Sequence, residues 1–271
     1  MSLLFLFTFA LYAFATISYQ AYFWSQNEKI RPAARITLLI AAGLHTLLLV
    51  HRYYQAGHTP ITTNHEAVSF FAWSVAVAFL SFRWRYNVKN FGTFASIMIT
   101  LLMTVSLFSS PALHELPPAL RSKWLPVHAS VALMANAFLA LAFCGGVMFL
   151  LQEREIKSRR FGIFYQRLPS LEALDSLNQH CIAVGFPLLT LGIITGSIWA
   201  KQAWGAYWQW DPKETWSLIT WLLYAALLHF RFTMGWRRRR AAIMAIIGFG
   251  AALFTLWGVS FLLEGLHAYV G

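Results

Sequence analysis

Charged residues are scarce in this chain. Only 11% of its 271 residues are charged and 58% are hydrophobic, whereas a soluble domain usually carries about 25% charged residues. The apolar residues form long blocks, with no soluble domain, long linker or low-complexity tract between them. No internal repeat is evident either, which argues against an inverted-repeat transporter. These absences predict an integral membrane protein.

Cysteine is also scarce. Cys144 and Cys181 lie within or at the ends of apolar segments and form no CxxC pair, which argues against a zinc site or a thiol–disulfide enzyme. The sequence contains no CxxCH, the attachment motif of c-type haem. If the protein handles haem, it does so without becoming a c-type cytochrome.

Eight apolar segments have about the length that a helix needs to cross a membrane. Roughly 20 residues span the hydrocarbon core, and in lipid such segments are helical because no other open structure satisfies their backbone hydrogen bonds. The segments are 2–24, 34–52, 67–82, 91–110, 127–151, 180–200, 215–234 and 241–263, and the third is the shortest. We therefore predict an all-α protein with about eight transmembrane helices in one membrane domain, residues 1–271.

The positive charge alternates between the loops. The net charge is +11, and every second loop together holds sixteen of the twenty-one lysines and arginines. This asymmetry is the positive-inside pattern, which predicts that both termini and the loop at about 201–216 lie outside. The run Arg237–Arg240 is then a cytoplasmic anchor close to anionic lipid, and we expect no nucleic acid partner.

The loop that ends at Trp216 is the most informative segment. Residues 204–216 include four tryptophans, a tyrosine, an aspartate and a glutamate. Rings at this density are costly to expose to water, and their polar edges disfavour the bilayer centre, so we predict a platform at the membrane surface for a large planar ligand. In a short interfacial helix, Trp204, Tyr207, Trp208 and Asp211 would share one face.

Part of this loop has a simpler interpretation. Asp211, Pro212 and Glu214 have the types and spacing of a helix N-cap, a first helical residue and an acid in the first turn. The cap does not explain the tryptophans. An interfacial aromatic belt usually contributes one or two rings per helix end, so a ligand platform is the better explanation of Trp204, Tyr207, Trp208 and Trp210.

These residues resemble a known family. Trp204–Trp216, continued by Leu218–His229, is similar to the tryptophan-rich WWD domain of the haem-handling protein superfamily, which includes the System II protein CcsA (ResC) and the System I protein CcmC. Further segments are similar to the System II branch, namely Pro60–Glu66 with Ser69–Trp73, Trp124–His128, and Gly265–Tyr269. The resemblance covers the chain from about residue 58 onward.

The resemblance gives roles to three histidines. His128 opens the fifth apolar segment and His267 closes the eighth; each could be an ordinary interfacial side chain, or the two could ligate haem iron from opposite sides of the platform. External histidines flank the WWD loop in the family, which favours ligation. His229 lies inside the seventh segment, where an ionisable residue indicates function, and it matches one of a histidine pair through which haem passes.

The remaining histidines need no such role. His45 lies in the middle of a segment, where a hydrogen bond between helices is the simpler interpretation. The other five lie near segment ends or in loops, and we expect them to be solvated or to face lipid headgroups; they are His51, His58, His65, His114 and His180.

The resemblance implies a haem-delivering subunit of a cytochrome c synthase in a bacterial plasma membrane or a thylakoid membrane. Its ligand would be haem b, bound transiently and without a covalent bond, and its partners a CcsB (ResB)-like protein and an apocytochrome c with CxxCH. No catalytic residue is implied. Alternatives are a CcmC-like haem exporter or chaperone, a HemX-like regulator of haem synthesis and, remotely, a small-solute transporter, which would need a polar site at the membrane midplane.

Overall fold

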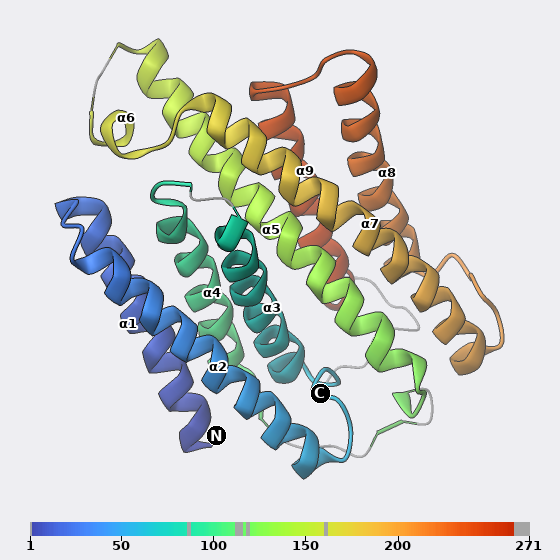
Figure 1. Ribbon diagram of the computed structural model, residues 1–271. Coiled ribbons are helices and arrows are strands. Elements are labelled where there is room, and N and C mark those ends of the chain that lie inside the picture. Colours follow the sequence, from blue (N-terminus) through green and yellow to red (C-terminus); the bar gives the residue numbers. More distant parts are fainter. Residues whose placement is uncertain (1, 86–87, 112–115, 118–119, 160–161, 263–271) are drawn as a thin grey trace. The chain divides into compact units, whose positions relative to one another are not determined.

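Long helices make up most of the protein. The structure is a computed structural model that describes residues 2–85, 88–111, 116–117, 120–159 and 162–262. Within these residues the chain is helical and contains no strand (Figure 1). The helices divide into two compact units, residues 1–114 and 115–271. The single membrane domain expected from the sequence stays a prediction.

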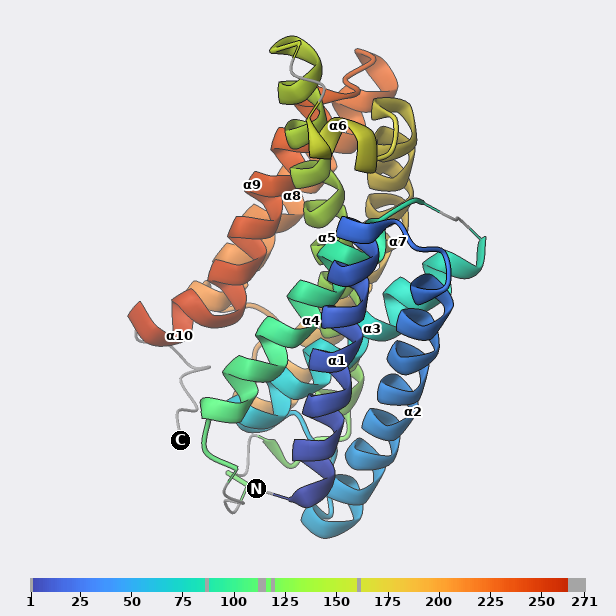
Figure 2. The same cartoon turned by 90° about the vertical axis from the view of Figure 1, so that its left-hand side faces the viewer.

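Unit 1 is a bundle of four helices: α1 (Leu3–Ser25), α2 (Ile30–Ala56), α3 (Asn64–Arg85) and α4 (Phe91–Phe108). Helix α1 packs against α2 and α4, and α3 packs against the same two helices; Figure 2 shows α1 between its neighbours. Aromatic side chains fill the interior, and Tyr12, Phe71 and Phe79 are fully buried. Burial of such rings is a main source of packing energy in a helical bundle.

Unit 2 contains α5 (Trp124–Lys157), α6 (Ile163–Arg167), α7 (Leu171–Trp204), α8 (Pro212–Thr233) and α9 (Arg239–Leu253). A π-helical turn, η2 (Phe254–Gly258), and α10 (Val259–Leu262) continue α9, as Figure 2 shows. The most extensive packing is between α5 and α7, and α9 packs on both α5 and α8.

Glycines bring α5 and α7 close together. A Cβ atom on Gly185 would lie 2.8 Å from the side chain of Leu139, and one on Gly192 would lie 3.3 Å from the backbone of Ala132. Both distances are too short for a normal contact. Small residues at a helix interface are the usual way that membrane helices approach closely, since lipid gives no hydrophobic drive for their association.

The helices agree with the predicted membrane spans, and four of them (α2, α3, α5 and α7) extend beyond the predicted segments at both ends. Seven helices in the described part of the chain are long and apolar enough to cross a membrane. Helix α8 has 22 residues but carries Lys213, Glu214, His229 and Arg231, and it is not among the seven. Helices α5 and α7 have 34 residues each, about 51 Å at the usual rise, so they exceed the ~30 Å hydrocarbon core.

Candidate functional site

His128 lies in the second turn of α5, against α7. Its Nδ1–H donates a hydrogen bond to the carbonyl oxygen of Gly192 over 2.8 Å. Gly196, one turn further along α7, gives the ring its space, because a Cβ atom there would lie 2.7 Å from Cε1 of the imidazole. Among the described residues, Nε2 of His128 has no hydrogen-bond partner. The imidazole is therefore fixed through one nitrogen, and the other retains its lone pair.

Two indole rings continue from this imidazole. The ring of Trp199 stacks on His128 with a centroid separation of 5.8 Å and an interplanar angle of 14°. Trp204, the last residue of α7, meets Trp199 edge to face at 4.8 Å. Trp199 is only 3% exposed, whereas Trp204 is half-buried. The rings of His128, Trp199 and Trp204 thus form a continuous row of contacts that reaches the end of α7.

The loop after Trp204 is not a helix, so the expected single helical face is wrong. Gly205 has φ +82° and ends α7, and Trp210 has φ +58°. Residues in this left-handed region cannot continue an α-helix. The carboxylate of Glu214 accepts hydrogen bonds from the backbone N–H groups of Gln209 and Asp211. These bonds fix the backbone on both sides of Trp210.

The predicted cap of α8 is confirmed. Asp211 is the N-cap, its carboxylate accepts a hydrogen bond from the backbone N–H of Lys213, and Glu214 completes a capping box. Asp211 is 5% exposed. Burial lowers the pKa of the Lys213 amine, and the charge of Asp211 partly opposes this effect.

Two further aromatic residues of the loop face outward. Tyr207 is 59% exposed and Trp210 is 69% exposed. The ammonium of Lys201 lies 5.6 Å from the centre of the Tyr207 ring and donates to the carbonyl of Gly205. Trp208 contacts Trp210 edge to face at 5.8 Å. Large aromatic rings exposed beside a defined backbone form a surface that a planar apolar ligand could cover.

The segment that bears His267 lies outside the described residues. The chain reaches it through η2, where the side chain of Phe254 contacts Trp216 at 4.3 Å and Thr255 lies 3.3 Å from Thr220 of α8. Single π-helical turns inside α-helices occur frequently at functional sites. The ligation of one haem iron by both His128 and His267 therefore stays a prediction.

His229 lies at the opposite end of α8 from the loop. It is 18 residues beyond Asp211, roughly 27 Å along the helix, and it is exposed. Arg231 faces the bundle instead, where it forms a bidentate ion pair with Asp175 and a hydrogen bond with Gln179. Two residues correspond to roughly 200° around a helix. His229 therefore points away from the helices of unit 2 and cannot contact the same ligand atom as His128.

Residues 61–267 match the family model described as cytochrome C assembly protein. The chain belongs to this family. It is 35% identical to the cytochrome c biogenesis protein CcsA of Porphyra purpurea, in a match that covers 88% of this chain and 86% of that protein. It is 36% identical to the CcsA of Synechococcus sp. (strain CC9902), in a match that covers 96% of this chain and 94% of that protein. Membership in the cytochrome c assembly family indicates a role in cytochrome c maturation.

A solved structure shares the fold. The cytochrome c heme lyase CcmF superposes with a TM-score of 0.64 at 19% sequence identity. The match covers 97% of this chain and 46% of CcmF, so the chain spans about half the length of that protein. At this identity the likeness concerns the fold alone.

In unit 1 of this family member, two histidines are buried, His45 and His65. His45 is buried, and its ring nitrogens lie 3.3 Å from the hydroxyl of Tyr12 and 2.9 Å from that of Ser69, which confirms the predicted bond between helices. His65 was expected at a headgroup or in water, and this is wrong. It is 9% exposed, and its Nδ1–H donates to the carbonyl of Ser106, because α4 covers the start of α3.

Glu66 has a structural environment as well. It is 2% exposed, forms an ion pair with Arg52 at 2.9 Å and accepts hydrogen bonds from Thr62. Arg52 also donates to the carbonyl of Pro111. The pair ties the end of α2 to the start of α3 and to the segment after α4. The segment Pro60–Glu66 thus fixes loops at this end of unit 1.

Sequence reasoning missed three residues that define the site: Trp199, Gly192 and Gly196. The two glycines form a Gly-x-x-x-Gly spacing, a pattern of close helix contact in membranes, and it could have marked the face of α7 that meets α5. Trp199 lies five residues before the loop, and no local pattern distinguishes it from a membrane-interface tryptophan.

Proposed function

We propose that this protein holds haem at the outer end of unit 2 and presents it for attachment to the CxxCH cysteines of an apocytochrome c. The observation that carries the proposal is the imidazole of His128. Its Nδ1–H donates to the carbonyl of Gly192, its ring stacks on Trp199, and its Nε2 has no hydrogen-bond partner among the described residues. Haem is the substrate in this proposal. It is bound without a covalent bond, as haem b, and it leaves this protein when it is attached to the apocytochrome c. The membership in the cytochrome c assembly family supports it.

The hydrogen bond of His128 is of the kind that is expected for an iron ligand. Histidines that bind metals nearly always donate their second ring N–H to a carbonyl or carboxylate, which fixes the tautomer and the ring orientation. Here the carbonyl of Gly192 accepts that bond, and Nε2 would bind the iron. We propose His267 as the second axial ligand, delivered by the chain that continues beyond α10.

The aromatic rings of the loop would hold the macrocycle. Trp204, Tyr207, Trp208 and Trp210 offer apolar area on one short segment, and the bonds of Glu214 to the loop backbone give that segment a fixed course. Lys213, whose pKa is lowered by burial, is one candidate partner for a haem propionate. A bound carboxylate would raise that pKa again by favouring the ammonium form. Lys201, which contacts Gly205 and Tyr207, is a second candidate.

The reaction then needs mainly positioning. Each thioether forms when a cysteine S–H adds across a haem vinyl group: the sulfur bonds to one carbon and the hydrogen goes to the other, so no oxidant is consumed. Holding the vinyl groups beside the thiols supplies much of the acceleration in such a bimolecular step. The side chains at the site would orient haem until the acceptor histidine replaces one iron ligand.

His229 supports the proposed partner. An exposed ionisable side chain on a membrane helix is costly in lipid, and that cost falls if another chain covers it. A CcsB (ResB)-like membrane protein would supply the second histidine, and haem would pass this pair before it reaches His128. The proposal locates the complex in a bacterial plasma membrane or in a thylakoid membrane.

The test is an absorption spectrum of the detergent-purified chain, co-expressed with and without a CcsB-like protein. We expect a low-spin b-type spectrum that is lost or altered in both His128→Ala and His267→Ala and partly restored by free imidazole. Unchanged haem content in both variants would remove the ligand assignment. Maturation of a reporter cytochrome c in cells separates a synthase subunit from a CcmC-like exporter, because haem export alone produces no thioether-bound haem.

A further inference from the structure

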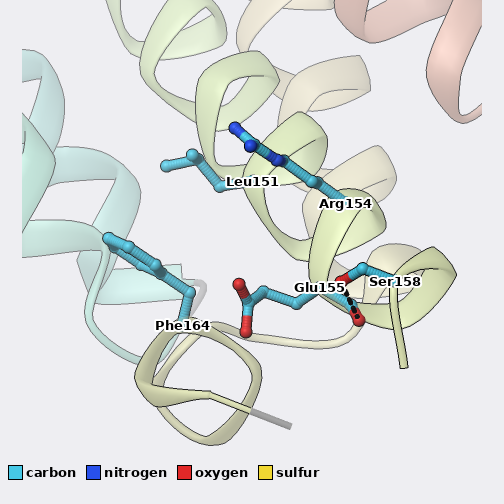
Figure 3. A pocket seen from close by; sticks show the side chains of 5 residues that line it. All are labelled: Leu151, Arg154, Glu155, Ser158 and Phe164. Carbon is cyan, nitrogen blue, oxygen red and sulfur yellow. Dashed lines mark hydrogen bonds between the residues drawn. The ribbon is translucent and has the colours of Figure 1, made fainter. Parts of the chain in front are cut away.

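A cavity lies at the basic end of unit 2, between α5 and α6. It has a volume of about 420 Å³ and is lined by Leu151, Arg154, Glu155, Ser158 and Phe164. Figure 3 shows Phe164 rising from α6 and the side chains of Leu151, Arg154 and Glu155 extending from α5. The lining therefore combines apolar surface, one cation, one anion and a hydroxyl group.

The two charges at this cavity have no protein counterion in the described residues. The neighbouring charges are engaged elsewhere: Glu153 forms ion pairs with Lys157 at 2.8 Å and with Arg239 at 3.2 Å. Glu155 accepts one hydrogen bond at Oε2 from the backbone N–H of Gly162, which leaves its charge uncompensated. Adjacent positions on a helix do not face each other, so Arg154 and Glu155 are available to separate groups of one ligand.

The residues around the cavity are those expected at the level of lipid headgroups. Along α5 the apolar sequence ends at Leu151, and Gln152, Glu153 and Arg154 follow directly. Helix α6 exposes Ile163 by 47%, Phe164 by 36% and Tyr165 by 39%. Large apolar side chains at such an end are most stable in the boundary between headgroups and acyl chains. A hydrated free anion would leave these rings in water, whereas a lipid would cover them.

We propose that this cavity binds a phospholipid whose headgroup joins a phosphate to a primary ammonium, as in phosphatidylethanolamine. The guanidinium of Arg154 would bind the phosphate, Oε1 of Glu155 would accept from the ammonium, and Leu151 and Phe164 would contact the start of an acyl chain. A purely anionic headgroup would leave Glu155 unpaired beside a negative ligand, which costs binding energy.

The test is a lipid titration of the delipidated full-length protein, followed by native mass spectrometry. The probes are phosphatidylethanolamine, phosphatidylcholine and phosphatidylglycerol with identical acyl chains. We expect phosphatidylethanolamine to bind about tenfold more tightly than phosphatidylcholine, whose trimethylammonium cannot donate a hydrogen bond; one charge-assisted hydrogen bond corresponds to a factor of this size. Tighter binding of phosphatidylglycerol, or equal binding of all three, would overturn the proposal.

Two variants assign the preference to this cavity. Glu155→Gln should remove the discrimination between ethanolamine and choline lipids, and Arg154→Gln should weaken both by a similar factor. The matched controls are Glu172→Gln and Arg237→Gln, which remove the same charges at exposed positions of unit 2. If the controls change lipid binding as much as the cavity variants do, the preference belongs to the general charge of this surface and the proposal fails.

Discussion

His45 in unit 1 and His128 in unit 2 both lie among aromatic rings, and their hydrogen bonds differ. Both ring nitrogens of His45 have hydroxyl partners, those of Tyr12 and Ser69. Only Nδ1 of His128 has a partner among the described residues, and its ring stacks on Trp199. A histidine with both nitrogens occupied holds helices together, whereas one that is fixed through a single nitrogen can bind something else.

The same contrast extends to the surroundings of each histidine. In unit 1 the buried Glu66 has Arg52 and Thr62 as partners, so the polar groups there satisfy one another. In unit 2 the loop exposes Tyr207 and Trp210 although its backbone course is fixed by Glu214. Rigid backbone with exposed aromatic surface is typical of a binding site that is formed before its ligand arrives.

The largest expected effect comes from exchanging the two histidines for alanine. His128→Ala should abolish the low-spin b-type spectrum, because it removes the proposed ligand. His45→Ala should leave the spectrum of bound haem unchanged and lower the thermal stability, because it leaves the hydroxyls of Tyr12 and Ser69 without their shared partner. Absorption spectra and thermal unfolding of both purified variants would measure this.

The opposite pattern would reverse the comparison. If His45→Ala changes the ligand type while His128→Ala leaves it intact, the binding site belongs to unit 1. Free imidazole provides a further control, since it should restore the spectrum of His128→Ala and should not restore the stability of His45→Ala.

The second prediction concerns the Arg52–Glu66 pair. Arg52→Met would leave the carboxylate of Glu66, whose side chain is 1% exposed, buried without a counterion. Breaking a buried pair in this way costs about 3–5 kcal/mol. The double variant Arg52→Met, Glu66→Met should be more stable than Arg52→Met alone, because no charge is then stranded. Denaturation in detergent would compare the three proteins; a double variant no more stable than Arg52→Met would show that the pair is not the cause.

The third prediction uses the close contact of Gly196 with His128. Gly196→Ala would place a methyl group 2.7 Å from Cε1 of the imidazole, and the ring would have to turn. Disturbing the orientation of a metal-binding histidine typically costs 10–100-fold in affinity, so we expect haem occupancy to fall by roughly this factor. Gly250→Ala on α9 is the matched control, since its added methyl meets open space. Equal haem occupancy in the two variants would refute the role of the contact.

Much of the fold could be predicted from the sequence, because membrane crossing depends on local composition. The apolar segments marked the long helices, and the residue types at Asp211 and Glu214 correctly predicted the N-cap of α8. The lengths of α5 and α7 were underestimated. Their ends carry polar residues that lower the local hydropathy, and these residues have partners on other helices: Asp175 of α7 pairs with Arg231 of α8, and Glu153 of α5 pairs with Arg239 of α9.

The site was less predictable, because it depends on which helix faces meet. Neither the contact of His128 with Gly192 nor its stacking on Trp199 follows from a local pattern; the partners are 64 residues apart in the first case. His65 was misjudged for the same reason, since its partner Ser106 belongs to another helix. The tryptophan-rich loop stood out by its composition, yet its non-helical conformation depends on Gly205 and Trp210 having positive φ.

The smallest expected effect separates the cap of α8 from haem binding. Asp211→Ala removes the acceptor of the Lys213 N–H and should cost about 1 kcal/mol of stability. Asp211→Asn keeps a capping acceptor and should cost much less, so the two variants differ in the cap while both lose the negative charge beside Lys213. If both variants bind haem equally well and differ only in stability, Asp211 acts as a cap. If both lose affinity to the same extent, its charge contributes to the site, and the loop of unit 2 carries function at a position that the sequence explains by helix geometry alone.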